Sequence, residues 1–179
     1  MKAWHLVALI AVVGIYLLTR PPSGEKIARK MDISVEAGSI AYDGVVYSTE
    51  WGKPVTRKGD IRHFIRAYNK HVPIVTFHAV LTTGEFSDPE IVTIDHNGGG
   101  SYFWRSKKQP EGTLIVLHFV PESDIVFRAL RGIDVGDSVE IVGRDETRGA
   151  IEGDDGSYLR LGHDNHKFVL VSQVMVGNR

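Results

Sequence analysis

Two histidines three residues apart are the first candidates for chemistry in this sequence. They are His163 and His166, which stand beside a carboxylate in the segment His163-Asp164-Asn165-His166. Neutral imidazole and carboxylate groups together suit Zn²⁺, so this segment could bind a metal ion. The same residues are typical of exposed turns, and a bare pair at this spacing has no preset ligand geometry. We therefore expect a polar turn here, with metal binding as the alternative.

Ser138 is the second candidate, because the stretch Gly136-Asp137-Ser138-Val139 could be the nucleophile block of a serine hydrolase. A hydrolase nucleophile stands at a strand-to-helix turn, where backbone amides can hold the developing oxyanion. Here Ser138 is followed by Val139-Glu140-Ile141-Val142, whose alternation is that of a strand. We therefore expect no catalytic residue at this position. The expected roles are structural: a turn at Gly136 and Asp137, a bend at Gly143, and core positions for Val135, Val139 and Ile141.

The aromatic run Tyr102-Phe103-Trp104-Arg105 is a third candidate. Such a run could stack on a sugar or a base, and its candidate binding residues are Tyr102, Trp104 and Arg105. The competing interpretation is that alternate aromatic side chains of a strand face the core. The sequence leaves both interpretations open.

His118 lies in an apolar segment that ends at Pro121. A buried ring nitrogen needs a hydrogen-bond partner. We therefore expect His118 and Pro121 to be structural, with the imidazole hydrogen-bonded inside the fold.

The most positive stretch of the chain runs from Arg57 to Lys70. Spacings of three and four place Ile61, Phe64, Ile65 and Tyr68 on one face of a helix that Asp60 would cap. The other face would carry Arg57, Lys58, Arg62, Arg66 and Lys70. We expect a solvated helix face, with phosphate or anionic lipid contact through Arg62, Arg66 and Lys70 as the alternative. A single patch without an aromatic platform does not predict nucleic-acid binding.

Strand patterns dominate the remaining sequence and would position these residues. Asp43-Gly44 is a strong hairpin signal between strands at 39–42 and 45–47. Further strands are expected at 74–81, 90–94, 102–104, 113–119, 138–142, 158–161 and 168–176. A short helix should open at 121–124 and stop at Gly132, with core residues Ile125, Phe127 and Leu130. One helix after about three strands and before two more predicts a mainly β fold with a five-stranded barrel like that of oligonucleotide/oligosaccharide-binding (OB) proteins.

An apolar segment from Ala3 to Leu18 precedes the β region, with Trp4 and Tyr16 near its ends. Its length lies at the short edge of a membrane-spanning helix, and aromatic rings favour the membrane boundary. The residues that follow, Arg20-Pro21-Pro22, are unlike the small residues that precede a signal-peptide cleavage site. We therefore expect an uncleaved transmembrane anchor, with residues 3–18 in contact with the membrane.

The composition excludes several classes of function. The chain has 179 residues, a formal net charge of -1 and no cysteine. Without cysteine it has no disulfide, thiolate metal site or cysteine nucleophile. The near-zero net charge gives no global field that would attract nucleic acid. We identify no motif that calls for a cofactor.

These patterns divide the chain into four expected parts. They are a transmembrane anchor at 1–20, a spacer at 21–35, a hairpin with a basic amphipathic helix at 36–72, and an OB-like β domain at 73–176.

The segment Leu117-His118-Phe119-Val120-Pro121 and the later block 130–143 resemble the core of a group of uncharacterised, single-pass, membrane-anchored bacterial proteins. The segment 77–81 and the aromatic run 102–105 are also similar, so the resemblance covers residues 73–143. The group usually closes with a serine-rich strand containing tryptophan and a later cysteine, whereas this chain has Gly156-Ser157-Tyr158-Leu159-Arg160 and no cysteine. The resemblance implies a membrane anchor and an exported small β domain, and it implies no activity.

These observations together predict a non-catalytic binding or scaffolding domain held at the bacterial inner membrane. The body is expected in the periplasm, with a protein partner in the envelope. The alternative is a metal-dependent or serine hydrolase that uses the His163/His166 segment or Ser138.

Overall fold

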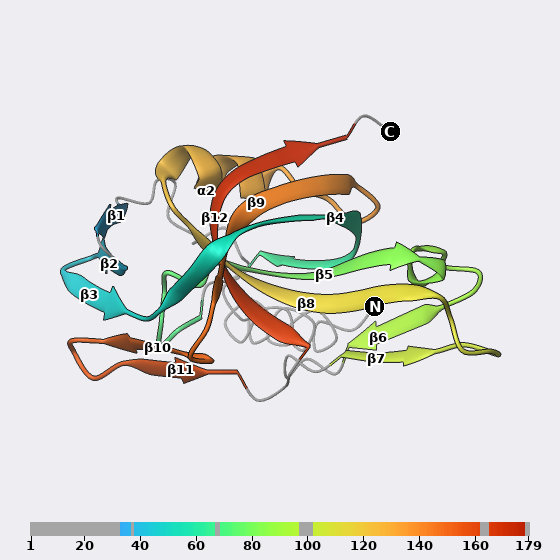
Figure 1. Cartoon of the computed structure of the whole chain (residues 1–179), viewed down its shortest axis with the longest axis horizontal. Helices are drawn as coiled ribbons and strands as arrows, with labels where there is room; N and C mark the ends of the chain where they lie inside the picture. Colours follow the sequence, from blue (N-terminus) through green and yellow to red (C-terminus); the bar gives the residue numbers. More distant parts are fainter. Residues whose placement is uncertain (1–32, 37, 67–68, 97–101, 162–164, 178–179) are drawn as a thin grey trace, which may run out of the picture.

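A computed structural model describes residues 33–36, 38–66, 69–96, 102–161 and 165–177 of the chain. Strands make up most of the described elements, so the prediction of a mainly β protein is confirmed (Figure 1). The strands form a closed barrel, a second five-stranded sheet and a two-stranded arm. The predicted anchor at residues 3–18 lies outside the described residues. Among the residues that are described, no helix is long and apolar enough to cross a membrane.

Five strands close the barrel in the order β12-β8-β5-β4-β9. They are β4 (Trp51–Arg66), β5 (Phe77–Gly84), β8 (Gly112–Pro121), β9 (Ser138–Glu146) and β12 (His166–Val176). All neighbouring pairs are antiparallel except β12 and β8, which run parallel. Alternation along each strand directs side chains such as Phe77, Leu117 and Val169 into the barrel interior.

One helix, α2 (Asp124–Arg131), connects β8 to β9, as the sequence predicts. The Ser123 side chain accepts a hydrogen bond from the backbone N–H of Val126, and Gly132 ends the helix. Phe127 and Leu130 are buried in the barrel core. Ile125 is 73% exposed, so its predicted core position is wrong.

The predicted basic helix is wrong, because residues 51–66 form the single long strand β4. The register with β5 shifts between Ile61 and His63, which leaves Arg62 as an extra residue in the ladder. This bulge lets Ile61 and Phe64, three residues apart, both pack on the barrel interior. The three-residue spacing of Ile61 and Phe64, which is typical of a helix, therefore arises here from a bulge in a strand.

The turn before β9 is built as the sequence predicts. Gly136 has a φ of 94°, a conformation that side chains with a Cβ rarely adopt. The Asp137 carboxylate accepts a hydrogen bond from the backbone N–H of Asp134. Val139 and Ile141 are buried in the barrel core, whereas Val135 is exposed, so its predicted core position is wrong. A Cβ on Gly143 would collide with the backbone carbonyl of Leu170, which explains the glycine at this barrel position.

A second sheet packs beside the barrel in the order β1-β2-β3-β10-β11. Its strands are β1 (Ile33–Glu36), β2 (Ser39–Tyr42), β3 (Val45–Ser48), β10 (Ala150–Gly153) and β11 (Tyr158–Arg160). The predicted hairpin of β2 and β3 is confirmed, and Asp43 and Gly44 both have positive φ angles in its turn. Buried Ile40 and Ile151 of this sheet join Phe168 of β12 in a second core.

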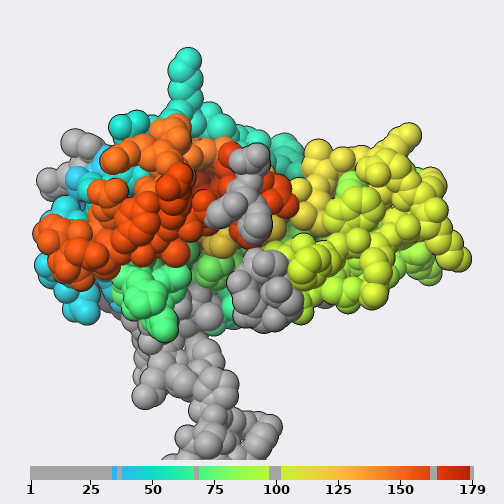
Figure 2. Space-filling view, turned by 90° about the horizontal axis from the view of Figure 1, so that it is seen from below, coloured from blue at the N-terminus to red at the C-terminus, as the bar shows by residue number. Residues whose placement is uncertain are grey.

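The arm is inserted between β5 and β8. It contains the 3₁₀ helix η2 (Glu85–Ser87) and the hairpin of β6 (Thr93–His96) and β7 (Tyr102–Arg105). Figure 2 shows this arm projecting from the body of the molecule. The predicted strand at 102–104 is confirmed, but of the predicted strand at 90–94 only Thr93 and Ile94 belong to β6.

The barrel begins upstream of the predicted domain boundary at residue 73. Strand β4 lies within the 36–72 segment, yet it closes the barrel between β5 and β9. Strands β1 to β3 share a sheet with β10 and β11, which come from the other end of the chain. The two segments are therefore interleaved in one body.

Candidate functional site

Three histidines meet on the outer side of the seam between β5, β8 and β12. His118 is 7% exposed, and its Nε2 lies 2.9 Å from Nδ1 of His166 in a hydrogen bond. The His78 ring meets the His118 ring edge-on, with 4.5 Å between ring centroids. The prediction that His118 is a buried, hydrogen-bonded residue is confirmed. We call these residues the seam histidines.

Burial keeps His78 and His118 neutral at physiological pH. Desolvation, followed by the neighbouring His78 and His166, lowers the pKa of His118 to about 3. Desolvation also lowers the pKa of His78 to about 4, with His166 and His96 acting in the same direction. Nδ1 of His118 has no hydrogen-bond partner in the described part of the chain. This favours the tautomer in which Nε2–H of His118 donates to His166, because an unpaired buried N–H would be the costlier arrangement.

A second ring cluster joins the arm to the barrel. The His63 ring of β4 stacks on the His96 ring of β6, with centroids 5.0 Å apart. The Tyr102 ring of β7 lies 5.3 Å from His63 and 4.9 Å from His96. Burial, followed by the neighbouring His96, lowers the pKa of His63. Burial raises the pKa of the Tyr102 phenol to about 12. We call these residues the arm-base cluster.

The structure does not show His163 and His166 as a metal-binding pair. His166 faces His118, and His163 lies outside the described residues. Within the described ranges, no group of three or more histidine, cysteine, aspartate or glutamate side chains is arranged to hold a metal ion. The contact between His118 and His166 is a hydrogen bond between two imidazole rings.

Ser138 stands in a strand context, as expected from its sequence. It begins β9, and its hydroxyl donates to the Asp60 carboxylate of β4. It lines an open cleft of about 400 Å³ together with Met175 and Val176 near the end of β12. A strand follows Ser138, so no helix N-terminus supplies oxyanion donors there.

The basic residues of β4 bind neighbouring segments of the fold. Arg62 donates to the backbone carbonyls of Phe86 and Val92, at 2.5 and 2.9 Å, and so ties the barrel to the arm. Arg66 donates to the carbonyls of Arg131 and Ile133 and to the Asp134 carboxylate. Arg57 pairs with Asp145, and Lys58 pairs with Glu140. Lys70 is exposed on the loop that leaves β4.

The predicted aromatic binding residues are divided between the two faces of the arm. Tyr102 belongs to the arm-base cluster, and Trp104 packs edge-on against Phe86 with 5.3 Å between centroids. Phe103 and Arg105 alternate with them and are exposed, and Arg105 pairs with Asp95 across the hairpin at 2.6 Å. Beside Arg105 lies an open cleft of about 550 Å³ lined also by Thr93, Lys107 and Lys108.

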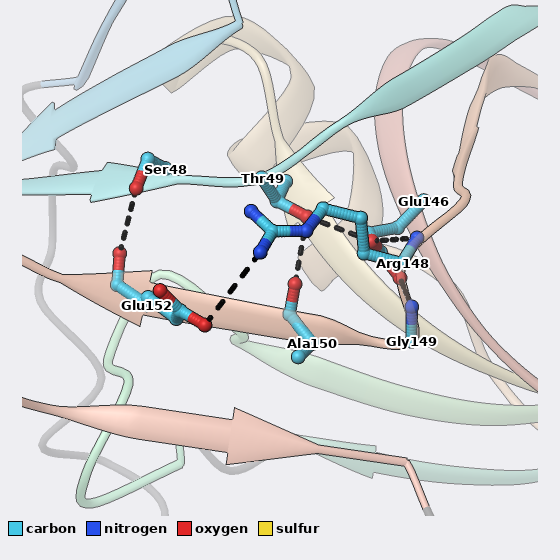
Figure 3. Close-up of polar contacts among 7 residues, drawn as sticks. All are labelled: Ser48, Thr49, Glu146, Arg148, Gly149, Ala150 and Glu152. Carbon is cyan, nitrogen blue, oxygen red and sulfur yellow. Dashed lines mark hydrogen bonds and ion pairs between the residues drawn. The ribbon is translucent and has the colours of Figure 1, made fainter.

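Glu146 is a buried polar residue that the sequence does not reveal. Its carboxylate accepts hydrogen bonds from the Thr49 hydroxyl at 2.8 Å and from the backbone N–H groups of Arg148 and Gly149 (Figure 3). The Thr49 hydroxyl also contacts the carbonyl of Ala150. This network fixes the point where β9 leaves the barrel and β10 enters the second sheet.

Sequence reasoning missed His63, His78 and His96. Five of the eight histidines of the chain belong to the seam histidines or the arm-base cluster. Most of them come from strands far apart in sequence. Strand pairing places His78 opposite His118, and ring contacts join His63 to His96 and His166 to His118. Of the three missed histidines, only His78 lies inside a predicted strand, at 74–81, whereas His63 lies in the predicted helix and His96 lies beyond the predicted strand at 90–94.

Comparison with known proteins assigns no family to this chain. No protein-family model matches it, and no curated protein matches it either. The geometry described above is therefore the basis for assigning a function.

Proposed function

We propose that this chain is a membrane-anchored, non-catalytic binding or scaffolding domain of the bacterial envelope, built on an OB-like barrel. The strand order and the place of the helix support the OB-like assignment. Strands β4, β5, β8, β9 and β12 would be the five strands in chain order, with α2 between the third and the fourth. The apolar segment 3–18 supports the anchor.

The exposed surface of the arm is the observation that carries the binding role. OB barrels bind ligands over their second and third strands, which here are β5 and β8. Val80 and Val116, on the outer side of these strands, are fully buried, so packed side chains already cover that face. Phe103 and Trp104 are 56% and 41% exposed on the arm inserted between the same strands. The arm therefore offers the surface that the barrel face lacks.

The chemistry of this surface fits a protein partner. Aromatic residues and arginine are enriched at the centres of protein interfaces. Phe103 and Arg105 stand on one face of β7, and Lys107 extends the same edge. The carboxylates of Asp95 and Glu85 pair with Arg105 and Lys108, so the surface is mixed in charge rather than uniformly basic. A mixed aromatic and charged surface suits a folded protein better than a polyanion.

Site-specific photocrosslinking in cells tests this function. A photoreactive residue at position 103 of the full-length chain should give one discrete adduct with another envelope protein. The matched control is position 158, because Tyr158 is similarly exposed, at 49%, on β11 of the second sheet. Equal adducts from both positions, or none from position 103, would contradict a binding role for the arm.

A further inference from the structure

The arm-base cluster brings three potential metal ligands together from three strands. His63, His96 and Tyr102 come from β4, β6 and β7, and each ring contacts the other two. The rings are half-buried, and the polar atoms Nε2 of His63 and Oη of Tyr102 are fully buried. His96 and Tyr102 are directly opposite each other in the β6–β7 ladder, so the hairpin fixes their spacing.

Two polar atoms of this cluster are buried without a hydrogen-bond partner in the described part of the chain. They are Nε2 of His63 and Oη of Tyr102. Each such buried group destabilises the fold, because it has lost its hydrogen bonds to water without replacing them. Because the rings of His63 and Tyr102 contact each other, a single bound ligand could satisfy both atoms.

We propose that His63, His96 and Tyr102 form a binding site for a divalent transition-metal ion. Imidazole nitrogens suit Zn²⁺ and Cu²⁺, and a phenolate oxygen adds a negative ligand. The His63 and His96 rings are stacked with 28° between their planes and 5.0 Å between centroids, so one ion at about 2.0 Å from each ring requires only a side-chain rotation that turns a nitrogen of each ring towards it. The third ligand is a phenol, so the cluster contains only two residues of the histidine, cysteine and carboxylate types.

Binding requires the phenol to lose its proton. The Oη–H bond breaks, the oxygen lone pair forms the bond to the metal, and the proton passes to solvent, with no change in oxidation state. The positive charge of the ion stabilises the phenolate. Each ion bound therefore releases one proton from Tyr102, and affinity rises with pH.

A bound ion would also connect the arm to the barrel. It would join β4 of the barrel to both strands of the arm, beside the contact that Arg62 makes with the arm carbonyls. The site is separate from the exposed face of Phe103, so metal binding and partner binding can fail independently.

Titration of the detergent-solubilised full chain with Cu²⁺ and with Zn²⁺ tests the proposal. Cu²⁺ is the stronger probe because it stands at the top of the affinity order for such ligands. We expect one equivalent of Cu²⁺ to bind with a phenolate-to-copper charge-transfer absorption. Tyr102→Phe, which keeps the ring, should abolish that absorption, and Tyr102→Phe and His63→Ala should each weaken binding about ten-fold or more. Cu²⁺ should displace bound Zn²⁺.

Matched variants separate this site from other ligands in the chain. His71→Ala and Tyr158→Phe alter an exposed histidine and an exposed tyrosine, and both should bind as the unaltered chain does. Circular dichroism melts establish that each variant is folded before it is titrated. The proposal is overturned if the chain binds neither ion, if Tyr102→Phe retains full affinity and absorption, or if only His163→Ala/His166→Ala removes binding.

Discussion

At the scale of single residues, the seam histidines make folding sensitive to acid. The neutral imidazoles of His78 and His118 fit their buried positions, and their pKa values in the fold are about 4 and about 3. In the unfolded chain a histidine has a pKa of about 6.5. Below that pH the unfolded chain takes up protons that the folded chain does not, so stability falls as pH drops from about 6.5 towards 4. Above about pH 7.5 these two residues add almost no pH dependence.

The expected loss is large enough to measure. At pH 5 each of the two residues should reduce the free energy of unfolding by about 2 kcal/mol relative to pH 7.5. Urea unfolding at both pH values measures this difference. His78→Phe keeps the edge-on ring contact and should remove about half of the stability difference between the two pH values. His71→Ala should leave that difference unchanged. A wild-type midpoint that is equal at the two pH values would refute the assignment.

Neighbouring positions on β9 should differ sharply in their tolerance of alanine. Ile141 is 1% exposed in the barrel core, so Ile141→Ala should cost about 2–5 kcal/mol. Ser138→Ala should cost under about 1 kcal/mol, because the exposed hydroxyl makes one hydrogen bond, to Asp60. Denaturant unfolding of both variants gives the comparison. Loss of a hydrolytic activity in Ser138→Ala without a change in midpoint would instead identify a nucleophile.

At the scale of elements, the sequence predicted correctly those elements whose turns or caps are formed by residues within or next to the element. The β2–β3 hairpin depends on Asp43-Gly44, and α2 depends on Ser123 and Gly132, all of which are visible in the sequence. Strand β4 was mistaken for a helix because its bulge at Arg62 is set by pairing with β5, which no local pattern encodes. The ring clusters could not be predicted for the same reason, since they depend on register between distant strands.

The contact of Arg62 with the arm leads to a prediction at this scale. Arg62→Ala would leave the carbonyls of Phe86 and Val92 without their charged donor, at an expected local cost of about 1–3 kcal/mol. Amide hydrogen exchange should therefore quicken in residues 85–96 and 102–108 while barrel strands such as β9 keep their protection. Lys58→Ala is the control, because its ion pair with Glu140 is exposed and contributes little. Equal exchange in Arg62→Ala and the unaltered chain would show that the arm is held by other contacts.

At the scale of the whole molecule, the barrel and the second sheet form one body. The second core combines Ile40 and Ile151 of the sheet with Phe168 and Leu170 of the barrel strand β12. Glu146 adds a polar link where the chain passes from one to the other. A linear division of the sequence could not foresee this arrangement, because the second sheet takes its strands from both ends of the chain. The mainly β character and the single helix before β9 were accessible, since they follow from strand and helix patterns in the sequence.

Two opposing features of the sequence bear on which side of the membrane this body would face if residues 3–18 form the proposed anchor. Arg20, Lys26, Arg29 and Lys30 follow the apolar segment and only Lys2 precedes it, which favours a cytoplasmic body under the positive-inside rule. A charged start followed by one apolar segment has the form of an export signal, and we expect this feature to prevail. An alkaline phosphatase fused after Arg179 should therefore be active, and a fluorescent protein that folds only in the cytoplasm should be dark. Replacing Arg29 and Lys30 by glutamine should raise phosphatase activity further, because it removes the charges that oppose export. A bright cytoplasmic reporter with an inactive phosphatase would place the arm, and any partner it binds, on the cytoplasmic side.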